Sequence, residues 1–245
     1  MTKHFKHLVL LGRPASGKSE FIDFMKGVPV SARKEKYHIA DLEEVDDFVW
    51  IWQKFIEDHL WEKIGKSRLY SKEYMPGNHG MKPEGERLLG FCMHKFNEVI
   101  KNGYLARPEF YDKNTLFIEF ARGGKNAYKN ALETLSPEVL KEAAILFVFT
   151  TRDESWRRNV ARYQEKLKHS ILAHMVPKET FDYFYNEHDW LDLTKDKSSG
   201  YLEFRGLKIP FATMNNEPES TDPKVLEPRY GGALGELWGL YEKRI

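Results

Sequence analysis

The chain has 245 residues, of which 41% are hydrophobic and 14% aromatic, enough for one large domain with a buried core. Its 38 Lys and Arg nearly balance its 37 Asp and Glu, and a net charge of +1 excludes the general basicity of many nucleic-acid-binding proteins. A single cysteine, Cys92, excludes a disulfide framework within the chain and favours a reducing compartment.

Apolar and β-branched runs recur along the chain and predict five strands, at residues 7–12, 37–40, 115–120, 144–151 and 208–214. The first, third and fourth runs are almost continuously apolar, which is typical of strands covered on both faces in a parallel sheet. Residues 201–211 alternate around Gly206 and predict a hairpin.

Helical patterns fill the intervals, with apolar residues at the helix period over 45–64, 88–100, 156–171 and 234–241. Ser136 before Pro137 predicts one more helix start. Strands that alternate with helices indicate α/β architecture with right-handed crossovers. Within 41–114 we expect a helical insertion with a mobile loop near 71–86, and residues 215–232 predict a polar connector.

Residues 12–19, GRPASGKS, match the phosphate-loop pattern G-x-x-x-x-G-K-[ST] at every fixed position. The glycines would let the backbone N–H groups point at phosphate oxygens, and a helix that starts near Lys18 adds the favourable end of its dipole. Lys18 would bind the β- and γ-phosphates, and the Ser19 hydroxyl would hold Mg²⁺. We therefore predict an ATP and Mg²⁺ site formed by Gly12, Pro14, Ala15, Ser16, Gly17, Lys18 and Ser19.

The loop resembles that of the P-loop kinases, especially nucleoside and nucleotide kinases, many of which read G-x-P-G-S-G-K. Gly12, Pro14, Ser16, Gly17 and Lys18 match that version, whereas Ala15 departs from it. The chain has neither the N-K-x-D element expected of a GTPase nor the L-S-G-G-Q element expected of an ABC-type ATPase.

This resemblance implies the α/β P-loop NTPase fold, a three-layer sandwich with a mostly parallel five-stranded sheet, a helical insertion and a lid. It implies a single kinase-like domain over residues 1–245, with an acceptor-binding insertion at 41–114 and a lid-like helical region at 152–200.

Two carboxylates follow or end predicted strands. Asp41, after the second strand, resembles the Asp that acts as base or metal organiser in several small-molecule P-loop kinases; the alternative is an N-cap for the next helix. Glu119 lies in an apolar run, where a carboxylate is costly without a partner. It resembles the kinase residue that orders Mg²⁺ or binds substrate, and the alternative is a buried pair with Arg122. The acidic residues at 43, 44, 46 and 47 are interpreted mainly as a solvated helix start.

Arginines provide the positive charge that phosphoryl transfer needs. Arg158 and Arg162 share a helix face after the fourth strand and resemble the lid arginines that clamp phosphates. We predict a catalytic role for these two, and substrate binding by Arg157 and Arg122. The alternative for the lid arginines is an exposed face paired with neighbouring glutamates.

The insertion would bind the acceptor. Its aromatic residues could stack on a base, although helical spacing favours core packing for Trp52 and Phe55. A basic cluster at residues 63, 66, 68 and 72 could meet a phosphorylated acceptor or simply face solvent.

These features predict an ATP- and Mg²⁺-dependent phosphotransferase that acts on a small hydroxyl- or phosphate-bearing acceptor, with a nucleoside or nucleotide as the first choice. The alternative is a non-catalytic ATP-binding switch, or an ATPase, that acts through a protein partner. No apolar stretch approaches a signal peptide or membrane span, so a cytoplasmic location is expected and a membrane partner is not. A nucleic-acid partner is not expected either, and a homodimer stays open.

Overall fold

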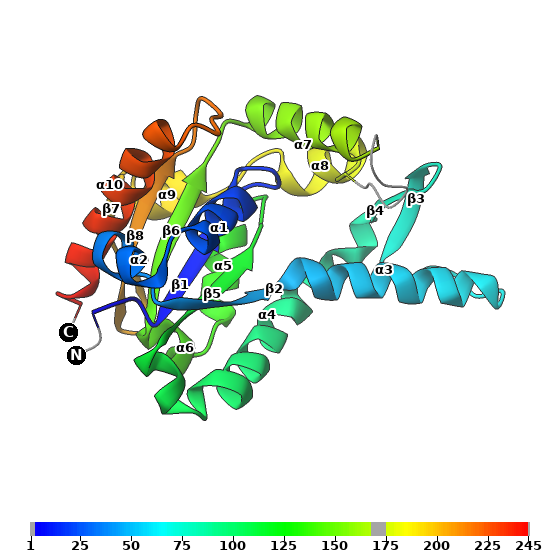
Figure 1. Cartoon of the computed structure of the whole chain (residues 1–245). Coiled ribbons are helices and arrows are strands. Elements are labelled where there is room, and N and C mark those ends of the chain that lie inside the picture. Colours follow the sequence, from blue (N-terminus) through cyan, green and yellow to red (C-terminus); the bar gives the residue numbers. More distant parts are fainter. Residues whose placement is uncertain (1–2, 168–174, 245) are drawn as a thin grey trace.

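A six-stranded sheet forms the centre of the protein (Figure 1). The structure is a computed structural model that describes residues 3–167 and 175–244, so the end of the helix predicted for 156–171 and part of the region predicted as a lid lie outside the described residues. The strand order is β2-β5-β1-β6-β8-β7, in which β7 alone is antiparallel to its neighbour. The strands are β1 (His7–Leu11), β2 (Asp41–Asp46), β5 (Asn114–Phe120), β6 (Ala143–Phe149), β7 (Ser199–Phe204) and β8 (Leu207–Asn215).

Four of the five predicted strands are confirmed as β1, β5, β6 and β8, but the sheet has six strands and not five. The sixth is β7, the first arm of the predicted hairpin. It turns into β8 through Arg205 and Gly206, which both have positive φ, as a two-residue hairpin turn requires.

The second predicted strand was wrong. Tyr37 ends helix α2 (Val30–Tyr37), His38 has a left-handed φ of 55°, and β2 begins only at Asp41. This strand reads DLEEVD and buries only Val45, because it lies at the edge of the sheet. Charged residues suit an exposed edge, where they discourage pairing with another chain. Because β2 contains so few apolar residues, a pattern of apolar runs does not predict it.

Helices cover both faces of the sheet and make a three-layer arrangement. One face packs against α1 (Lys18–Gly27), α2 and α10 (Pro223–Tyr241), and the other against α4 (Arg87–Ile100), α5 (Ala127–Thr134), α6 (Pro137–Lys141) and α9 (Trp190–Thr194). The N-cap predicted before α6 is confirmed, since the Ser136 side chain accepts a hydrogen bond from Val139 N. Helix α10 begins at Pro223, so half of the predicted polar connector is helical.

The insertion predicted from residue 41 begins only after β2, because Asp41–Asp46 is a strand of the central sheet. The segment that starts at Asp47 adds a third apolar cluster beside the sheet. It contains α3 (Asp47–Lys63), β3 (Ser71–Met75), β4 (Asn78–Met81), a 3₁₀ turn (Pro83–Glu86) and α4, then a π-helical turn (Lys101–Leu105) and a second 3₁₀ turn (Pro108–Asp112). The irregular loop expected near 71–86 is instead the β3–β4 hairpin, which turns at Gly77 with φ 75°. Figure 1 shows α3 extending beyond the edge of the sheet that β2 forms.

The remaining helices are α7 (Arg152–Leu167), which follows β6, and α8 (Lys178–Tyr185). Helix α8 packs against the insertion through Phe181, Phe184 and Tyr185. Within the described residues, no helix is both long enough and apolar enough to cross a membrane.

Candidate active site

The loop between β1 and α1 has the tight curvature that a phosphate site needs. Gly12 and Gly17 have φ values of 149° and 105°. A Cβ at Gly12 would lie 2.5 Å from the Val148 carbonyl oxygen, and one at Gly17 would lie 2.1 Å from Nδ2 of Asn216. Both positions therefore require glycine. Ala15 also has a left-handed φ, 56°, at the position where the similar kinase loops carry glycine.

Lys18 opens α1 and lies inside this loop. Its Nζ donates to the carbonyl oxygens of Gly12 (3.2 Å) and Arg13 (3.0 Å) and lies 3.8 Å from Oε1 of Glu119. Burial lowers the pKa of its ammonium group, against the opposing effect of Glu119. Ser16 Oγ is buried with no hydrogen-bond partner among the described residues. An orphaned hydroxyl, an ammonium group and a cradle that admits no Cβ together fit phosphate oxygens.

Glu119 and Asp46 lie beside each other at the end of the sheet next to Lys18, and all three line one cavity. They are directly paired in register on the parallel strands β5 and β2. Burial raises the pKa of Glu119 to about 7 although Lys18 opposes the shift, and burial raises the pKa of Asp46 to about 6. Asp46 is also the N-cap of α3, because Oδ1 accepts from Phe48 N at 2.8 Å. Two carboxylates with raised pKa values beside a lysine are typical of a catalytic centre.

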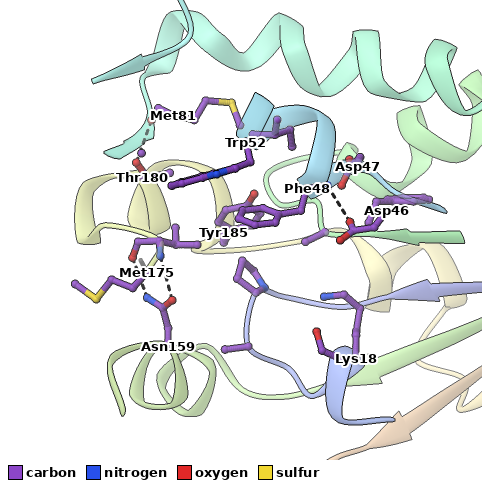
Figure 2. Close-up of a pocket in the computed structure, with 18 of the residues that line it drawn as sticks. Lys18, Asp46, Asp47, Phe48, Trp52, Met81, Asn159, Met175, Thr180 and Tyr185 are labelled. Carbon is purple, nitrogen blue, oxygen red and sulfur yellow. Dashed lines mark hydrogen bonds between the residues drawn. The ribbon is translucent and has the colours of Figure 1, made fainter. Parts of the chain in front are cut away.

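A cavity of about 270 Å³ extends from this centre (Figure 2). Lys18, Ser19, Asp46, Glu119 and Arg162 line one part of it. The other part is mainly apolar and aromatic and is lined by residues that include Phe48, Trp52, Phe55, Met81, Met175, Val176 and Tyr185.

Two polar side chains at the apolar end of the cavity, those of Asn159 and Thr180, already bind main-chain groups. Asn159 exchanges two hydrogen bonds with the main chain of Val176, at 2.8 and 3.1 Å, and the Thr180 hydroxyl donates to the Met81 carbonyl. This part of the site therefore offers a flat apolar body a surface to stack on, with the charged groups at the opposite end.

Arg122 does not line the cavity. Its guanidinium forms an ion pair with Asp47 at 2.7 Å, and both side chains are about 5% exposed or less. It also donates to the Leu89 carbonyl of α4 at 3.1 Å. Burial raises the pKa of Asp47, while Arg122 acts in the opposite direction. The pair ties the start of α3 to the loop after β5, which fixes the strand ends that carry Asp46 and Glu119.

The three arginines that the sequence predicts for a lid have different surroundings. Arg162 lines the cavity and pairs with Glu20. Arg158 is buried behind the loop, where it donates to the Asn216 carbonyl at 2.8 Å and lies 3.5 Å from the Ser16 carbonyl. Arg157 is exposed and pairs with Glu154 and Glu219 outside the cavity.

Asp41 lies at the beginning of β2, in register with Asn114 at the start of β5, and pairs with Arg33 at 3.5 Å. This end of the strand is remote from the phosphate loop, so the expected position of Asp41 at a strand's carboxyl end was wrong because the strand itself was misplaced. Asp46 occupies that end instead.

The structure thus brings together Lys18, Ser19, Glu119 and Arg162, and it leaves Asp41, Arg122, Arg157 and Arg158 outside the cavity. None of the four residues of the predicted basic cluster lines the cavity; Arg68, for example, pairs with Glu62 at 3.0 Å. Asp46 and Asp47 were interpreted as part of a solvated helix start. The helix start is confirmed, with Asp46 as its N-cap, but Asp47 is buried and both residues line the cavity. The N-cap signal in the sequence indicated the helix and not the site.

Mg²⁺ fits this set of side chains only together with a nucleotide. The Ser19 hydroxyl and the carboxylates of Asp46 and Glu119 line one cavity. Over residues 3–167 and 175–244, however, no group of three or more His, Cys, Asp or Glu is arranged to hold a metal ion. Mg²⁺ usually keeps several waters and takes phosphate oxygens beside one or two carboxylates, so the residues present are compatible with it.

Comparisons with known proteins find distant similarity to solved structures, and no match to a family model or a curated protein. A crystal structure of APE1195 is 15% identical with a TM-score of 0.41, covering 99% of this chain and 97% of that one. An unliganded sugar kinase from Janibacter sp. is 12% identical with a TM-score of 0.42, covering 96% and 98%. A structure from the PezAT chromosomal toxin-antitoxin system of Streptococcus pneumoniae is 15% identical with a TM-score of 0.40, covering 99% and 86%.

Proposed function

We propose that the protein is an ATP- and Mg²⁺-dependent phosphotransferase that acts on a small acceptor with a flat, largely apolar body and a hydroxyl or phosphate group, with a nucleoside or nucleotide as the first choice. The observation that carries the proposal is the sharing of one cavity by a glycine-cradled lysine, two carboxylates and an aromatic wall. Phosphoryl transfer is catalysed mainly by positioning and charge stabilisation, and these are the groups that it requires.

Each side chain has a proposed role. Lys18 and Arg162 would neutralise the charge that develops on the transferred phosphoryl group. Asp46 takes the place that the sequence suggested for Asp41, and either Asp46 or Glu119 would orient or deprotonate an acceptor hydroxyl. Ser19, with one of these carboxylates, would hold Mg²⁺, which when bound supplies further neutralisation of the phosphates. Arg158 would act on the nucleotide through the loop that it supports.

A screen of acceptors tests this proposal. Purified protein is incubated with Mg–ATP and a panel of nucleosides, nucleoside monophosphates and other alcohols, and ADP formation is measured above the background of ATP hydrolysis. We expect at least one acceptor to stimulate ADP formation in the wild type and none to do so in Lys18→Ala. Absence of Mg–ATP binding by the wild-type protein would refute the proposal.

A second candidate function is a non-catalytic ATP-binding switch, or an ATPase, that acts through a protein partner. It is favoured by the apolar residues that α3 leaves on the surface, where Val49, Ile56 and Leu60 are 49–62% exposed. Such a protein would bind Mg–ATP, but no acceptor would stimulate its turnover in the screen.

A further inference from the structure

Arg13 occupies a position that the phosphate-loop pattern leaves free, yet its side chain is only 8% exposed. Its guanidinium donates to three main-chain carbonyl groups: Nη1 to Thr150 at 3.0 Å, Nε to Tyr185 at 3.2 Å and Nη2 to Asn186 at 3.4 Å. Nη1 also lies 3.0 Å from Nε2 of His188. The side chain therefore connects the phosphate loop to Thr150, just after β6, and to the segment 185–188, which begins at the last residue of α8.

The contact with His188 requires a neutral imidazole. Arginine can only donate, so Nε2 of His188 must accept. Burial lowers the pKa of His188 to about 4, which keeps the ring neutral near pH 7. Within the described residues no carboxylate pairs with Arg13. Its positive guanidinium is therefore stabilised by hydrogen bonds to carbonyl oxygens and to one ring nitrogen. A planar fork satisfies such a set of acceptors, and the point charge of a lysine does not.

The main chain of Arg13 holds the phosphate-binding groups on the other side. Its carbonyl oxygen accepts from Lys18 Nζ at 3.0 Å and from Ser16 N at 3.2 Å. At the far end of the side chain, Tyr185 belongs to the aromatic wall of the cavity. Arg13 thus contacts the Lys18 ammonium group through its main-chain carbonyl and the main chain of Tyr185, in the aromatic wall, through its side chain.

We propose that Arg13 is a positioning residue for the nucleotide: its guanidinium anchors the phosphate loop to the segment 185–188, and this anchor holds the carbonyl group that orients Lys18. The inference rests on the proposed nucleotide site, because it assigns no function to Arg13 without it. Arg13 itself does not line the cavity, so its effect on a bound nucleotide passes through the loop.

Isothermal titration calorimetry with Mg–ATP tests the inference on the full chain. We expect Arg13→Ala to weaken Mg–ATP binding by roughly 10- to 100-fold, by analogy with the loss seen when the hydrogen-bond partner that orients a metal ligand is removed. The matched control is Arg33→Ala. Arg33 is also buried and also donates to three main-chain carbonyl groups, those of Met25, Val28 and Ala40, but at the other end of the sheet. We expect this control to lower stability while leaving Mg–ATP affinity unchanged.

Two further measurements distinguish positioning from general destabilisation. Methylguanidinium added at millimolar concentration should restore Mg–ATP affinity to Arg13→Ala by occupying the vacated carbonyl groups, whereas Arg13→Lys should stay weak because its ammonium cannot reach them all. His188→Ala should weaken binding in the same direction, although His188 does not line this cavity, and should have no additional effect in the Arg13→Ala background.

The outcomes separate the two proposals. If the wild-type protein does not bind Mg–ATP, the proposed function fails and the inference fails with it. If the wild type binds and Arg13→Ala, or Arg13→Lys should the alanine variant not fold, binds equally well, the inference alone is overturned. An equal loss of affinity in Arg33→Ala would also overturn it, since the effect would then be one of stability.

Discussion

Replacing Glu119 with glutamine should change how the stability of the protein depends on pH. Burial raises the pKa of this carboxyl from 4.5 to about 7 in the folded chain. Between these two values the folded state holds a proton that the unfolded state has released. The free energy of unfolding of the wild type must therefore fall as the pH rises through this window. The amide side chain introduced by Glu119→Gln is neutral throughout, so the variant loses this part of the pH dependence.

The magnitude follows from the size of the shift. One pKa unit corresponds to about 1.4 kcal/mol. Between pH 5 and pH 8 the folded carboxyl releases nearly its whole proton, while the unfolded one has already released most of its own. Integration gives a loss of about 2 kcal/mol for the wild type relative to Glu119→Gln over this interval. Asp46 carries a shift in the same direction, but it is present in both proteins and so largely cancels in the comparison.

Guanidinium chloride unfolding at pH 5 and pH 8, followed by circular dichroism, measures this difference. The stability of Glu119→Gln relative to wild type should be higher at pH 8 than at pH 5 by about 2 kcal/mol. Glu203→Gln, at an exposed position of β7, controls for the loss of one charge. Parallel stability curves for wild type and Glu119→Gln, or a difference of opposite sign, would refute the burial argument for this carboxyl.

Three other substitutions test the site. Lys18→Ala should abolish Mg–ATP binding in calorimetry while the far-ultraviolet circular dichroism stays native; unchanged affinity would remove the loop from the proposal. Ala15→Gly should raise the free energy of unfolding by about 0.5 kcal/mol, because release of the left-handed φ of 56° outweighs the greater entropy of unfolded glycine; a loss of stability in urea unfolding would contradict this. Arg122→Gln should cost about 3–5 kcal/mol, since it leaves Asp47 buried and unpaired, whereas Lys178→Gln, which breaks an exposed pair with Asp182, should cost little. If Arg122→Gln and Lys178→Gln lowered the free energy of unfolding equally, the buried pair of Arg122 and Asp47 would not contribute more to stability than an exposed pair.

The sequence was sufficient to predict the central architecture because the core strands are apolar on both faces. β1, β5 and β6 are nearly continuous runs of buried residues, and their order with the intervening helices indicates a parallel sheet. The hairpin at Gly206 was also predictable, since its turn needs a residue that tolerates positive φ. The edge strand β2 was not, because a strand with one exposed edge needs few apolar residues and its acidic composition suggests a helix start.

The misplaced second strand also led to the wrong carboxylate at its carboxyl end. With the strand assigned to 37–40, Asp41 stood at its end; with β2 at Asp41–Asp46, the residue at that end is Asp46. Glu119 and Arg162 both line the cavity, because an apolar run and a helical face fix their positions along the chain, and their catalytic roles stay predictions. The alternative of a buried pair between Glu119 and Arg122 was wrong, since spacing along a chain does not tell which carboxylate an arginine meets in space, and Arg122 pairs with Asp47. For Arg157 the structure agrees with the alternative of an exposed helix face paired with a neighbouring glutamate, Glu154, and adds Glu219 as a second partner.

The strand that carries the phosphate loop is hydrogen-bonded on both sides, to β5 and β6, and all five of its residues are buried. Amide protons at such positions exchange with deuterated solvent mainly when the whole domain unfolds. The end of the cavity proposed to bind the nucleotide is thus attached to a rigid strand, whereas the aromatic wall belongs mainly to α3 and α8, which lie outside the sheet. Redesign of the proposed acceptor preference can therefore be attempted on those two helices without altering the strand from which the loop departs.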